Sequence, residues 1–370
     1  MEKIKILHII KSLGRGGAEM LLPETLKVHD VSKFEFHYIY FLPWKNQMVD
    51  AIEKSGGKVT CISAKNNLSL LLQYAKVKAY CKENKIQIIH AHLPWAGVLA
   101  RIVSKLSGIK VLYTEHNNFD KYHFLTRLLS KLTYQWQTKV LAVSEDAKVA
   151  LEKHNLFHDI VYVPNGVNTS FFSKKNKFGS IENVEQFVVN DKVIGTVAVF
   201  RKQKRLDIFI EVAHLAQQKK LPFKFLMVGD GPEMEMIKAL MAKYQLQNVL
   251  LAGLQESPID FMNYMDIFLI TSDFEGLPVA LLEAMSMEIV PFCTGVGGIP
   301  NVLKNTQNGV LLTSQEPEDI LFTLVQKSID ESANFETMKK NARTTVENQY
   351  SIQRMVNQLE SIYTEVLNHG

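Results

Sequence analysis

The arrangement of apolar residues along the chain constrains its fold more than any other feature. Short runs rich in Ile, Val, Leu and Phe alternate with longer amphipathic segments, a pattern typical of β-α-β units in a parallel sheet. In the first half the predicted strands are Lys5–Ile10, Glu35–Phe41, Lys58–Ile62, Ile86–Ala91, Lys110–Thr114, Val140–Val143 and Ile160–Val163. The helices between them are predicted at Ala18–His29, Gln47–Lys54, Leu68–Glu83, Ala96–Leu106, Thr126–Gln137 and Glu145–His154.

A second series of strands follows after a break. Its members are predicted at Val193–Val199, Phe223–Val228, Val249–Ala252, Ile267–Thr271, Ile289–Cys293 and Gly309–Leu311. Residues 171–190, where Gly, Asn, Ser and Lys cluster without lasting periodicity, are expected to be a linker. We therefore predict an α/β protein with two tandem doubly wound, Rossmann-like domains, at residues 1–170 and 191–350, and a ligand cleft between them.

The last predicted helix covers residues 351–370 and has an apolar stripe. The stripe consists of Met355, Leu359, Tyr363 and Leu367, and we expect this helix to pack back toward the N-terminal domain.

Composition excludes several classes of protein. A chain that is 46% hydrophobic and 22% charged is neither disordered nor collagen-like. Its charge-free runs are too short and too interrupted to cross a bilayer, and its first residues resemble a strand rather than a signal peptide, so we expect a cytoplasmic protein. The chain has three cysteines, Cys61, Cys81 and Cys293, which are odd in number and widely spaced. We therefore expect reduced core thiols rather than disulfides or a cysteine zinc site.

Charge is distributed unevenly along the chain. Residues 1–170 hold 23 Lys and Arg against 14 Asp and Glu, whereas residues 171–370 hold 19 against 24. A basic half favours an anionic membrane surface or a phosphate-bearing substrate. A chance distribution of solvated lysines explains the numbers equally well, and both interpretations stay open here.

A glycine-rich loop, Leu13–Glu19, follows the first predicted strand and leads into a helix. Glycines let backbone N–H groups approach a ligand closely, and a helix N-terminus favours an anion. The spacing of Gly14, Gly16 and Gly17 does not match Gly-x-Gly-x-x-Gly, which disfavours a nicotinamide dinucleotide site.

His90 and His92 stand at the end of a predicted strand, where the period of two places both imidazoles on one face. Zinc could bind this pair together with Glu115 and His116, which follow the next strand. The alternative, which we favour, is that these histidines contact a substrate or a neighbouring carbonyl group. We expect no metal site.

Four cations lie at the turn after the first strand of the second series. Together with the following helix N-terminus they could neutralise a diphosphate, although we expect only about half of them to contact it. They are Arg201, Lys202, Lys204 and Arg205.

The segment from Thr271 to Pro300 has the most specific pattern. Pro278 fits the first position of a helix, where its missing N–H costs nothing. Glu283 lies farther along this otherwise apolar helix, Val279–Met287. Burying a carboxylate there without donors is costly, so we predict that Glu283 accepts hydrogen bonds from ligand hydroxyls. The alternative is a glutamate at the helix edge in water.

Glu275-Gly-Leu-Pro-x-x-x-x-Glu283, followed by Gly297-Gly-Ile-Pro300, resembles the signature of the retaining glycosyltransferases of family 4, which have the GT-B fold. Further segments occur in the family's order, so the resemblance covers nearly the whole chain. They are Arg15–Glu19, His90–His92, Thr114–His116, Val143–Ala147, Val163–Val167, Gly195–Asp207 and Val228–Pro232.

The resemblance implies a role for each matching residue. Glu275 is expected to bind hydroxyl groups of the donor sugar, and Glu283 the ribose of its nucleotide. Gly276 and Leu277 are expected to contact the sugar and phosphates through backbone N–H groups.

The same resemblance places further residues around the donor. Gly16 and Gly17 are expected near the diphosphate, Lys204 on it, and His116 beside the sugar. His116, Lys204 and Glu275 are the implied catalytic residues.

The sequence also departs from the family pattern. Val199 stands where the family commonly has an arginine, so we expect Arg201 to substitute for it, and Asn301 stands where a glutamate is frequent. The metal-binding Asp-x-Asp motif of another glycosyltransferase fold is absent. We therefore expect metal-independent transfer without a cofactor, with Lys and Arg in the place of Mg²⁺.

The implied function is transfer of a hexose or N-acetylhexosamine, with retention, from a nucleotide diphosphate sugar to a glycan or lipid-linked acceptor in polysaccharide biosynthesis, with no nucleic acid partner. A nucleotide-sugar epimerase of the same fold and a non-catalytic nucleotide-sugar-binding protein are the alternatives.

Residues 121–136 combine three cations with aromatic and leucine residues at helical spacing. Such a helix could lie on the anionic inner face of a membrane, or its apolar face could pack in the core.

Overall fold

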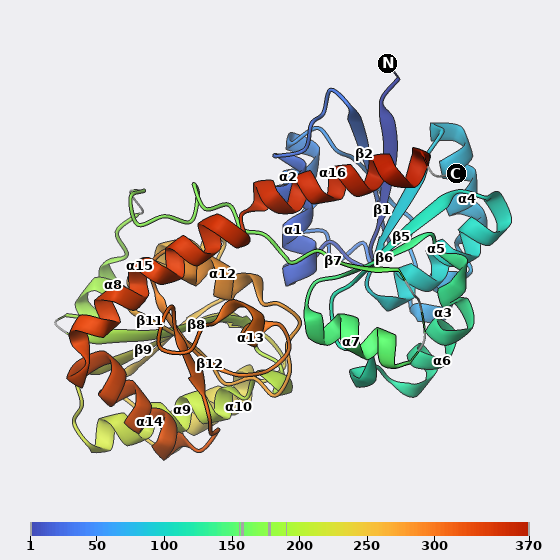
Figure 1. Ribbon diagram of the computed structural model, residues 1–370. Helices are drawn as coiled ribbons and strands as arrows, with labels where there is room; N and C mark the ends of the chain where they lie inside the picture. The colour runs from blue at the N-terminus through green and yellow to red at the C-terminus, as the bar shows by residue number, and fades with distance from the viewer. Residues whose placement is uncertain (1, 155, 157–158, 177–178, 190, 369–370) are drawn as a thin grey trace. The chain divides into compact units, whose positions relative to one another are not determined.

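The computed structural model describes residues 2–154, 156, 159–176, 179–189 and 191–368. The chain divides into two compact units (Figure 1). The N-terminal unit consists of Met1–Gly166 together with Ile352–Gly370, and the C-terminal unit consists of Val167–Ser351.

The N-terminal unit is built on a seven-stranded sheet in the order β3-β2-β1-β4-β5-β6-β7, with every pair of neighbours parallel. Its strands are β1 (Ile4–Ile9), β2 (Phe34–Tyr40), β3 (Lys58–Cys61), β4 (Ile88–His92), β5 (Lys110–Glu115), β6 (Lys139–Ala142) and β7 (Ile160–Tyr162). Because both faces of such a sheet are covered, its central strands are largely apolar rather than alternating.

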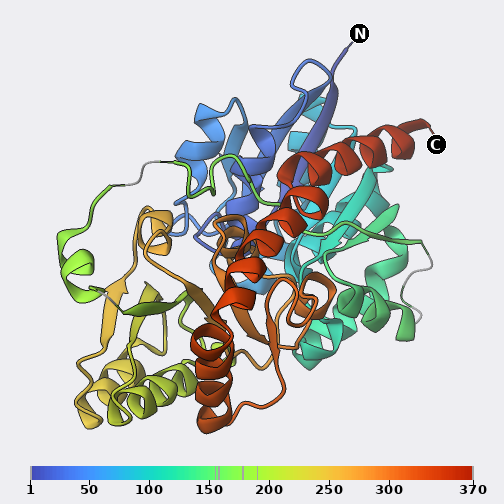
Figure 2. The ribbon, with the colours of Figure 1, turned by 60° about the vertical axis from the view of Figure 1, so that its left-hand side comes forward.

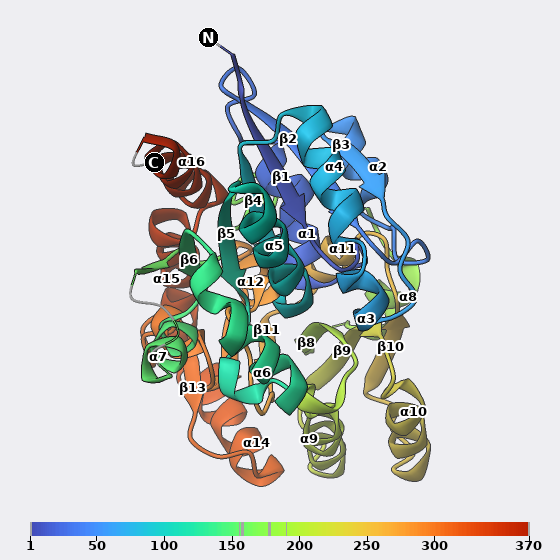
Figure 3. The ribbon, with the colours of Figure 1, turned by 90° about the vertical axis from the view of Figure 1, so that its right-hand side faces the viewer.

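Helices cover both faces of this sheet, and Figure 3 shows α4 and α5, which lie on one of them. Apolar residues of α1 (Gly17–Leu26), α2 (Val49–Lys54) and α16 (Ile352–Asn368) share one core with the strands. Those of α3 (Asn67–Leu71), α4 (Tyr74–Asn84), α5 (Pro94–Ser107) and α7 (Glu145–Lys153) form the core of the other face. The remaining helix, α6 (Phe124–Thr133), packs on α5.

The last helix of the chain therefore belongs to the first unit. Figure 2 shows the red α16 lying across strands of that unit. Of its predicted apolar stripe, Leu359 and Tyr363 are buried, and Met355 and Leu367 are half-buried against the same core.

The C-terminal unit contains a six-stranded parallel sheet in the order β10-β9-β8-β11-β12-β13. Its strands are β8 (Lys192–Val199), β9 (Phe223–Asp230), β10 (Val249–Gly253), β11 (Ile267–Ile270), β12 (Val290–Thr294) and β13 (Val310–Leu312). Its helices are α8 (Glu182–Phe187), α9 (Leu206–Gln218), α10 (Met234–Lys243), α11 (Pro258–Met262), α12 (Val279–Ser286), α13 (Ile299–Val302), α14 (Pro317–Val325) and α15 (Ser332–Gln349). The prediction of two Rossmann-like domains is confirmed.

Several local predictions were wrong. The predicted helix Leu68–Glu83 is two helices, α3 and α4, and Thr126–Gln137 ends in a 3₁₀ turn at Tyr134–Trp136. The expected linker, residues 171–190, lies within the C-terminal unit and includes α8. Cys61 is exposed rather than a core thiol, because β3 is the edge strand of its sheet.

Candidate functional site

Each sheet has one point where the strand order reverses, between β1 and β4 in the first unit and between β8 and β11 in the second. Loops on the two sides of such a point diverge, and ligands of open α/β sheets bind there, beyond the carboxyl ends of the strands. The residues predicted to bind the donor follow β1, β5, β8 and β11. Topology thus places most of them beside the two switch points.

In the C-terminal unit, Lys204 and Glu275 meet directly. The Lys204 Nζ donates to Glu275 Oε1 over 2.5 Å, and Ser272 Oγ donates to the same oxygen over 2.7 Å. The side chain of Glu275 is only 9% exposed and that of Lys204 22% exposed. A nearly buried carboxylate needs such donors, since leaving one unpaired costs several kcal/mol. The two predicted catalytic residues of this unit are therefore brought together.

Hydrogen bonds hold the turns after β8 and β11 to each other. Thr271 Oγ1 donates to the carbonyl oxygens of Lys204 and Arg205 over 3.0 and 2.9 Å. The backbone N–H of Asp273 donates to the carbonyl of Gln203 over 2.8 Å. These contacts fix the backbone on both sides of the Lys204–Glu275 pair.

The glycines of Gly297-Gly-Ile-Pro300 let a third loop approach this turn. Gly297 has φ +58°, and a side chain there would run into the backbone of Glu275 and Gly276. The N–H of Gly298 donates to the carbonyl of Gly276 over 2.7 Å. Glycine is required because other residues disfavour this conformation and would fill the space.

Helix α12 carries the second predicted carboxylate. Leu277 is buried, and Pro278 is the residue before the helix rather than its first position, because its extended ψ of 121° keeps it outside the helix. Glu283 is 8% exposed and lies among buried residues of α12. This burial excludes the alternative of a glutamate in water at the helix edge.

The four cations after β8 diverge instead of forming one cluster. Arg201 and Lys202 are exposed. Arg205 pairs with Asp207 over 2.9 Å and with Asp273 over 3.5 Å. Only Lys204 of the four contacts a predicted donor-binding side chain, so substitution of the missing family arginine by Arg201 remains a prediction.

In the N-terminal unit, a carboxylate stands at the glycine loop. Gly16 precedes α1, and the side chain of Glu19 lies against it in the position that a Cβ would occupy. Ser12 Oγ donates to Glu19 Oε1 over 3.0 Å. An acidic side chain at a helix N-terminus is favourable, but it competes with any phosphate at Gly16 and Gly17.

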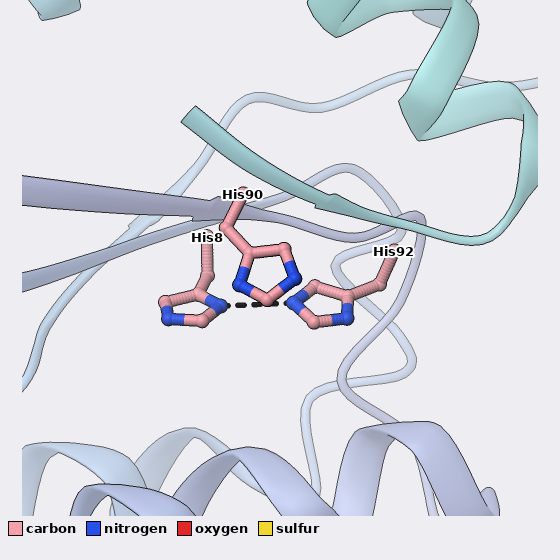
Figure 4. Close-up of side chains that lie close together, drawn as sticks. All are labelled: His8, His90 and His92. Carbon is pink, nitrogen blue, oxygen red and sulfur yellow. Dashed lines mark hydrogen bonds between the residues drawn. The ribbon is translucent and has the colours of Figure 1, made fainter. Parts of the chain in front are cut away.

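Four histidines form a cluster at the carboxyl ends of β1, β4 and β5. Figure 4 shows three of them, His8, His90 and His92. His8 Nδ1 and His92 Nε2 are 2.8 Å apart, and His92 Nδ1 and His116 Nε2 are 3.2 Å apart. The rings of His90 and His92 lie 4.3 Å apart, as expected for one strand face.

Ring nitrogens of His8, His90 and His92 lie within 4.8 Å of one another, so these residues are the set in the described part of the chain that could hold a metal ion. Of the zinc set considered from the sequence, His90 and His92 belong to this group, whereas Glu115 and His116 do not. Glu115 accepts hydrogen bonds from the hydroxyls of Tyr113, Tyr122 and Tyr134 instead of facing the histidines.

Comparisons with known proteins agree with this geometry. Residues 34–171 match the family model Glycosyltransferase Family 4, and residues 178–345 match the model Glycosyl transferases group 1. The chain is 26% identical to the UDP-Gal:alpha-D-GlcNAc-diphosphoundecaprenol alpha-1,3-galactosyltransferase of Escherichia coli, covering 99% of this chain and 98% of that protein. It is 25% identical to the capsular polysaccharide biosynthesis glycosyltransferase CapM of Staphylococcus aureus, with the same coverage.

A solved structure shares the fold over almost the whole chain. The complex of Anabaena HepE with UDP and glucose has a TM-score of 0.85 and 19% identity, covering 98% of this chain and 99% of that one. The chain is a glycosyltransferase with the GT-B fold. The resemblance to the family 4 glycosyltransferases inferred from the sequence is thereby confirmed.

Sequence reasoning missed several polar residues of this glycosyltransferase that contact predicted site residues. Ser272 supports Glu275, and His8 bonds to His92. A signal for His8 exists, since it is a histidine within an apolar strand, and β1 places it directly beside His90 of β4. β1 and β4 are neighbours in the sheet but not consecutive in the chain, so the sequence alone does not show that these two histidines meet.

Glu115 of the glycosyltransferase is expected to make the stability of the N-terminal unit depend on pH. Complete burial raises the pKa of Glu115 from 4.5 to about 7. Ionising it in the folded protein is therefore costly, and stability falls as the pH rises from about 4.5 to 7, by about 3 kcal/mol for this group. Denaturant unfolding of wild type and Glu115→Gln across this range measures the effect.

The difference in unfolding free energy between wild type and Glu115→Gln separates the effect of Glu115 from that of the buried histidines, which both proteins contain. Burial lowers the pKa of His8, His90 and His92, so their contribution has the opposite sign and is lost as the pH falls. We expect the free energy of unfolding of Glu115→Gln to increase relative to that of wild type as the pH rises. A difference in unfolding free energy that stays constant between pH 4.5 and 7 would contradict the prediction.

Proposed function

We propose that this enzyme transfers a hexose or N-acetylhexosamine, with retention of configuration and without a metal ion, from a nucleotide diphosphate sugar to a glycan or lipid-linked acceptor. The observation that carries the proposal is the Lys204–Glu275 pair at the switch point of the C-terminal unit, where the 2.5 Å contact is supported by Ser272. Such a turn offers a cation for a diphosphate next to a carboxylate for sugar hydroxyls.

The chemistry follows from the charge that develops. The bond between the anomeric carbon and the phosphate oxygen breaks, and negative charge grows on the diphosphate. Lys204 stabilises that charge, as an oxyanion donor does. The acceptor oxygen attacks from the same face, and its proton passes to the leaving phosphate oxygen. Glu275 then serves as an acceptor for sugar hydroxyls rather than as a nucleophile.

The names of similar proteins supply the first donors to test. The Escherichia coli relative is named for UDP-Gal, and the Anabaena structure contains UDP and glucose. We propose a UDP-hexose as the donor class on this ground. Thermal unfolding with UDP, GDP, ADP and their sugars tests it, because a ligand that binds the native state raises the melting temperature.

Transfer assays with the best donor separate the candidate functions. The proposal expects product only when an acceptor is present, an α-linkage from an α-linked donor, and turnover unchanged by EDTA. Product formed from the donor alone would indicate an epimerase. Donor binding without turnover would indicate a non-catalytic binding protein. Loss of turnover with EDTA would indicate a metal-dependent enzyme.

The surface of α6 supports a membrane location for the acceptor. This helix buries its small polar residues Thr126, Ser130 and Thr133. Leu129 is half-buried, and the other apolar residues of the helix are exposed. The exposed fractions are 68% for Phe124, 48% for Leu125, 41% for Leu128 and 65% for Leu132. The alternative that the apolar face of this segment packs in the core does not hold for α6, because the buried residues of the helix are polar. Tyr134, just after the helix, does lie in the core.

Cations border this apolar face. Lys121 and Lys131 are exposed, Arg127 is half-buried, and the sequence has no acidic residue from 121 to 136. No helix in the described part of the chain is both long and apolar enough to span a bilayer. We therefore propose that α6 lies on the surface of an anionic membrane, where a lipid-linked acceptor would be found.

Replacing Leu128 and Leu132 by serine is expected to weaken binding to phosphatidylglycerol vesicles about tenfold or more, since each side chain contributes on the order of 1 kcal/mol when buried in lipid. Vesicle co-sedimentation measures this. Val149→Ser is the matched control, because Val149 is an exposed apolar residue on α7. The proposal that α6 binds a charged membrane surface would be contradicted if wild type bound phosphatidylcholine vesicles as well as phosphatidylglycerol vesicles. It would also be contradicted if the double variant bound phosphatidylglycerol vesicles as wild type does.

A further inference from the structure

Three of the clustered histidines form a continuous hydrogen-bonded chain. His8 comes from β1, His92 ends β4, and His116 follows β5. His8 Nδ1 lies 2.8 Å from His92 Nε2, and His92 Nδ1 lies 3.2 Å from His116 Nε2. His92 therefore uses both of its ring nitrogens on neighbouring imidazoles.

The fourth histidine does not belong to this chain. His90 Nδ1 is 2.7 Å from the hydroxyl of Tyr363, and His90 Nε2 is 2.7 Å from Thr114 Oγ1. Both of its nitrogens are committed to hydroxyl groups. His90 packs against the chain without joining it, at 5.0 Å from the His8 ring and 4.3 Å from the His92 ring.

Burial keeps the chain uncharged. His8 and His92 are buried, and the ring of His8 stacks on Tyr38 at 5.0 Å. Desolvation lowers the pKa of His8 and His92 well below the ordinary value and that of His116 to about 4. A neutral imidazole carries one N–H, so each has one donor nitrogen and one acceptor nitrogen.

Two proton arrangements satisfy such a chain. If His8 donates to His92, then His92 donates to His116 Nε2, and the proton of His116 is on Nδ1. If His116 donates instead, both bonds reverse, and Nδ1 of His116 becomes an acceptor. The tautomer of His116 is thus tied to those of His92 and His8, as in metal and catalytic sites where a partner fixes which ring nitrogen is protonated.

We propose that His92 and His8 are positioning residues that fix the orientation of the His116 imidazole and determine which of its nitrogens carries the proton. A small cavity of about 20 Å³ lies beside the chain, and His8, His92 and His116 are among the residues that line it. The consequence for catalysis rests on the proposed function, which gives His116 its place beside the donor sugar.

NMR of protein with isotope-labelled histidine side chains tests this proposal, because nitrogen shifts distinguish the two tautomers. We expect one tautomer of His116 in the wild type and a mixture or the opposite tautomer in His92→Phe. His8→Phe is the second variant if His92→Phe does not fold, since the aromatic surroundings of Phe36 and Tyr38 accept a phenyl ring. Tyr363→Phe is the matched control, because it removes a hydrogen bond of His90 and leaves the chain intact.

Unchanged His116 signals in both chain variants, or equal changes in Tyr363→Phe, would overturn the proposal. Steady-state kinetics then distinguish a failure of this positioning role from a failure of the proposed function. We expect kcat of His92→Phe to fall about tenfold or more with little change in KM, as for other partners of catalytic imidazoles. A changed tautomer with unchanged kcat would support the positioning role and contradict a place for His116 at the reacting sugar.

Discussion

Replacement of Lys204 by alanine is expected to lower turnover about 100-fold, because one donor to the charge of the transition state is lost. Lys204 is the cation after β8 that lies against Glu275, with its Nζ 2.5 Å from the carboxylate. The charge on the leaving diphosphate is greater in the transition state than in the bound substrate, so kcat should fall more than KM rises. Steady-state kinetics with saturating acceptor measure both.

Lys202→Ala is the matched control for this substitution. Lys202 lies in the same turn, but it is exposed, and we expect turnover within about twofold of wild type because an exposed cation interacts weakly. Glu275 loses a partner in Lys204→Ala, so thermal unfolding must show that the variant is folded. Equal turnover of Lys204→Ala and wild type would remove Lys204 from the diphosphate site.

Replacement of Glu283 by alanine is expected to weaken nucleotide binding about 10- to 100-fold. Hydrogen bonds to a charged group contribute about 1.5–3 kcal/mol, and each 1.4 kcal/mol is tenfold in affinity. Glu283 is 8% exposed, so little water competes for its oxygens. Calorimetric titration with the nucleoside diphosphate that best raises the melting temperature measures the loss.

Two variants accompany this measurement. Glu283→Gln keeps the shape of the side chain and one of its two acceptor oxygens. A smaller loss of affinity than for alanine is therefore expected if ribose hydroxyls donate to the carboxylate. Glu318→Gln, at an exposed position of α14 in the same unit, should bind as wild type does. Wild-type affinity in Glu283→Ala would contradict ribose recognition by this residue.

The strands of both sheets could be predicted because their signal is local. A strand buried on both faces is largely apolar, and β12 is buried at every position. Helix boundaries were predicted less well. The break between α3 and α4 and the place of Pro278 depend on backbone angles that composition does not set.

The candidate site was predictable only in part. Glu275, Glu283 and Lys204 were predicted from the family motifs. The structure joins Lys204 to Glu275, and the roles of all three toward a donor stay predictions. The role of Ser272 and the approach of Glu19 to Gly16 were not found. Both depend on side-chain positions in turns, which no periodicity describes.

The sequence by itself determined the alternation of strands and helices, the two Rossmann-like domains and the glycosyltransferase family, since each follows from patterns within short segments. Only the tertiary structure decided that His8 meets His92 and that α6 exposes its apolar face. The physical reason is that these features arise from contacts between residues far apart in the chain. Parallel strands become neighbours by crossover connections, and a helix face is buried or exposed according to what it packs against.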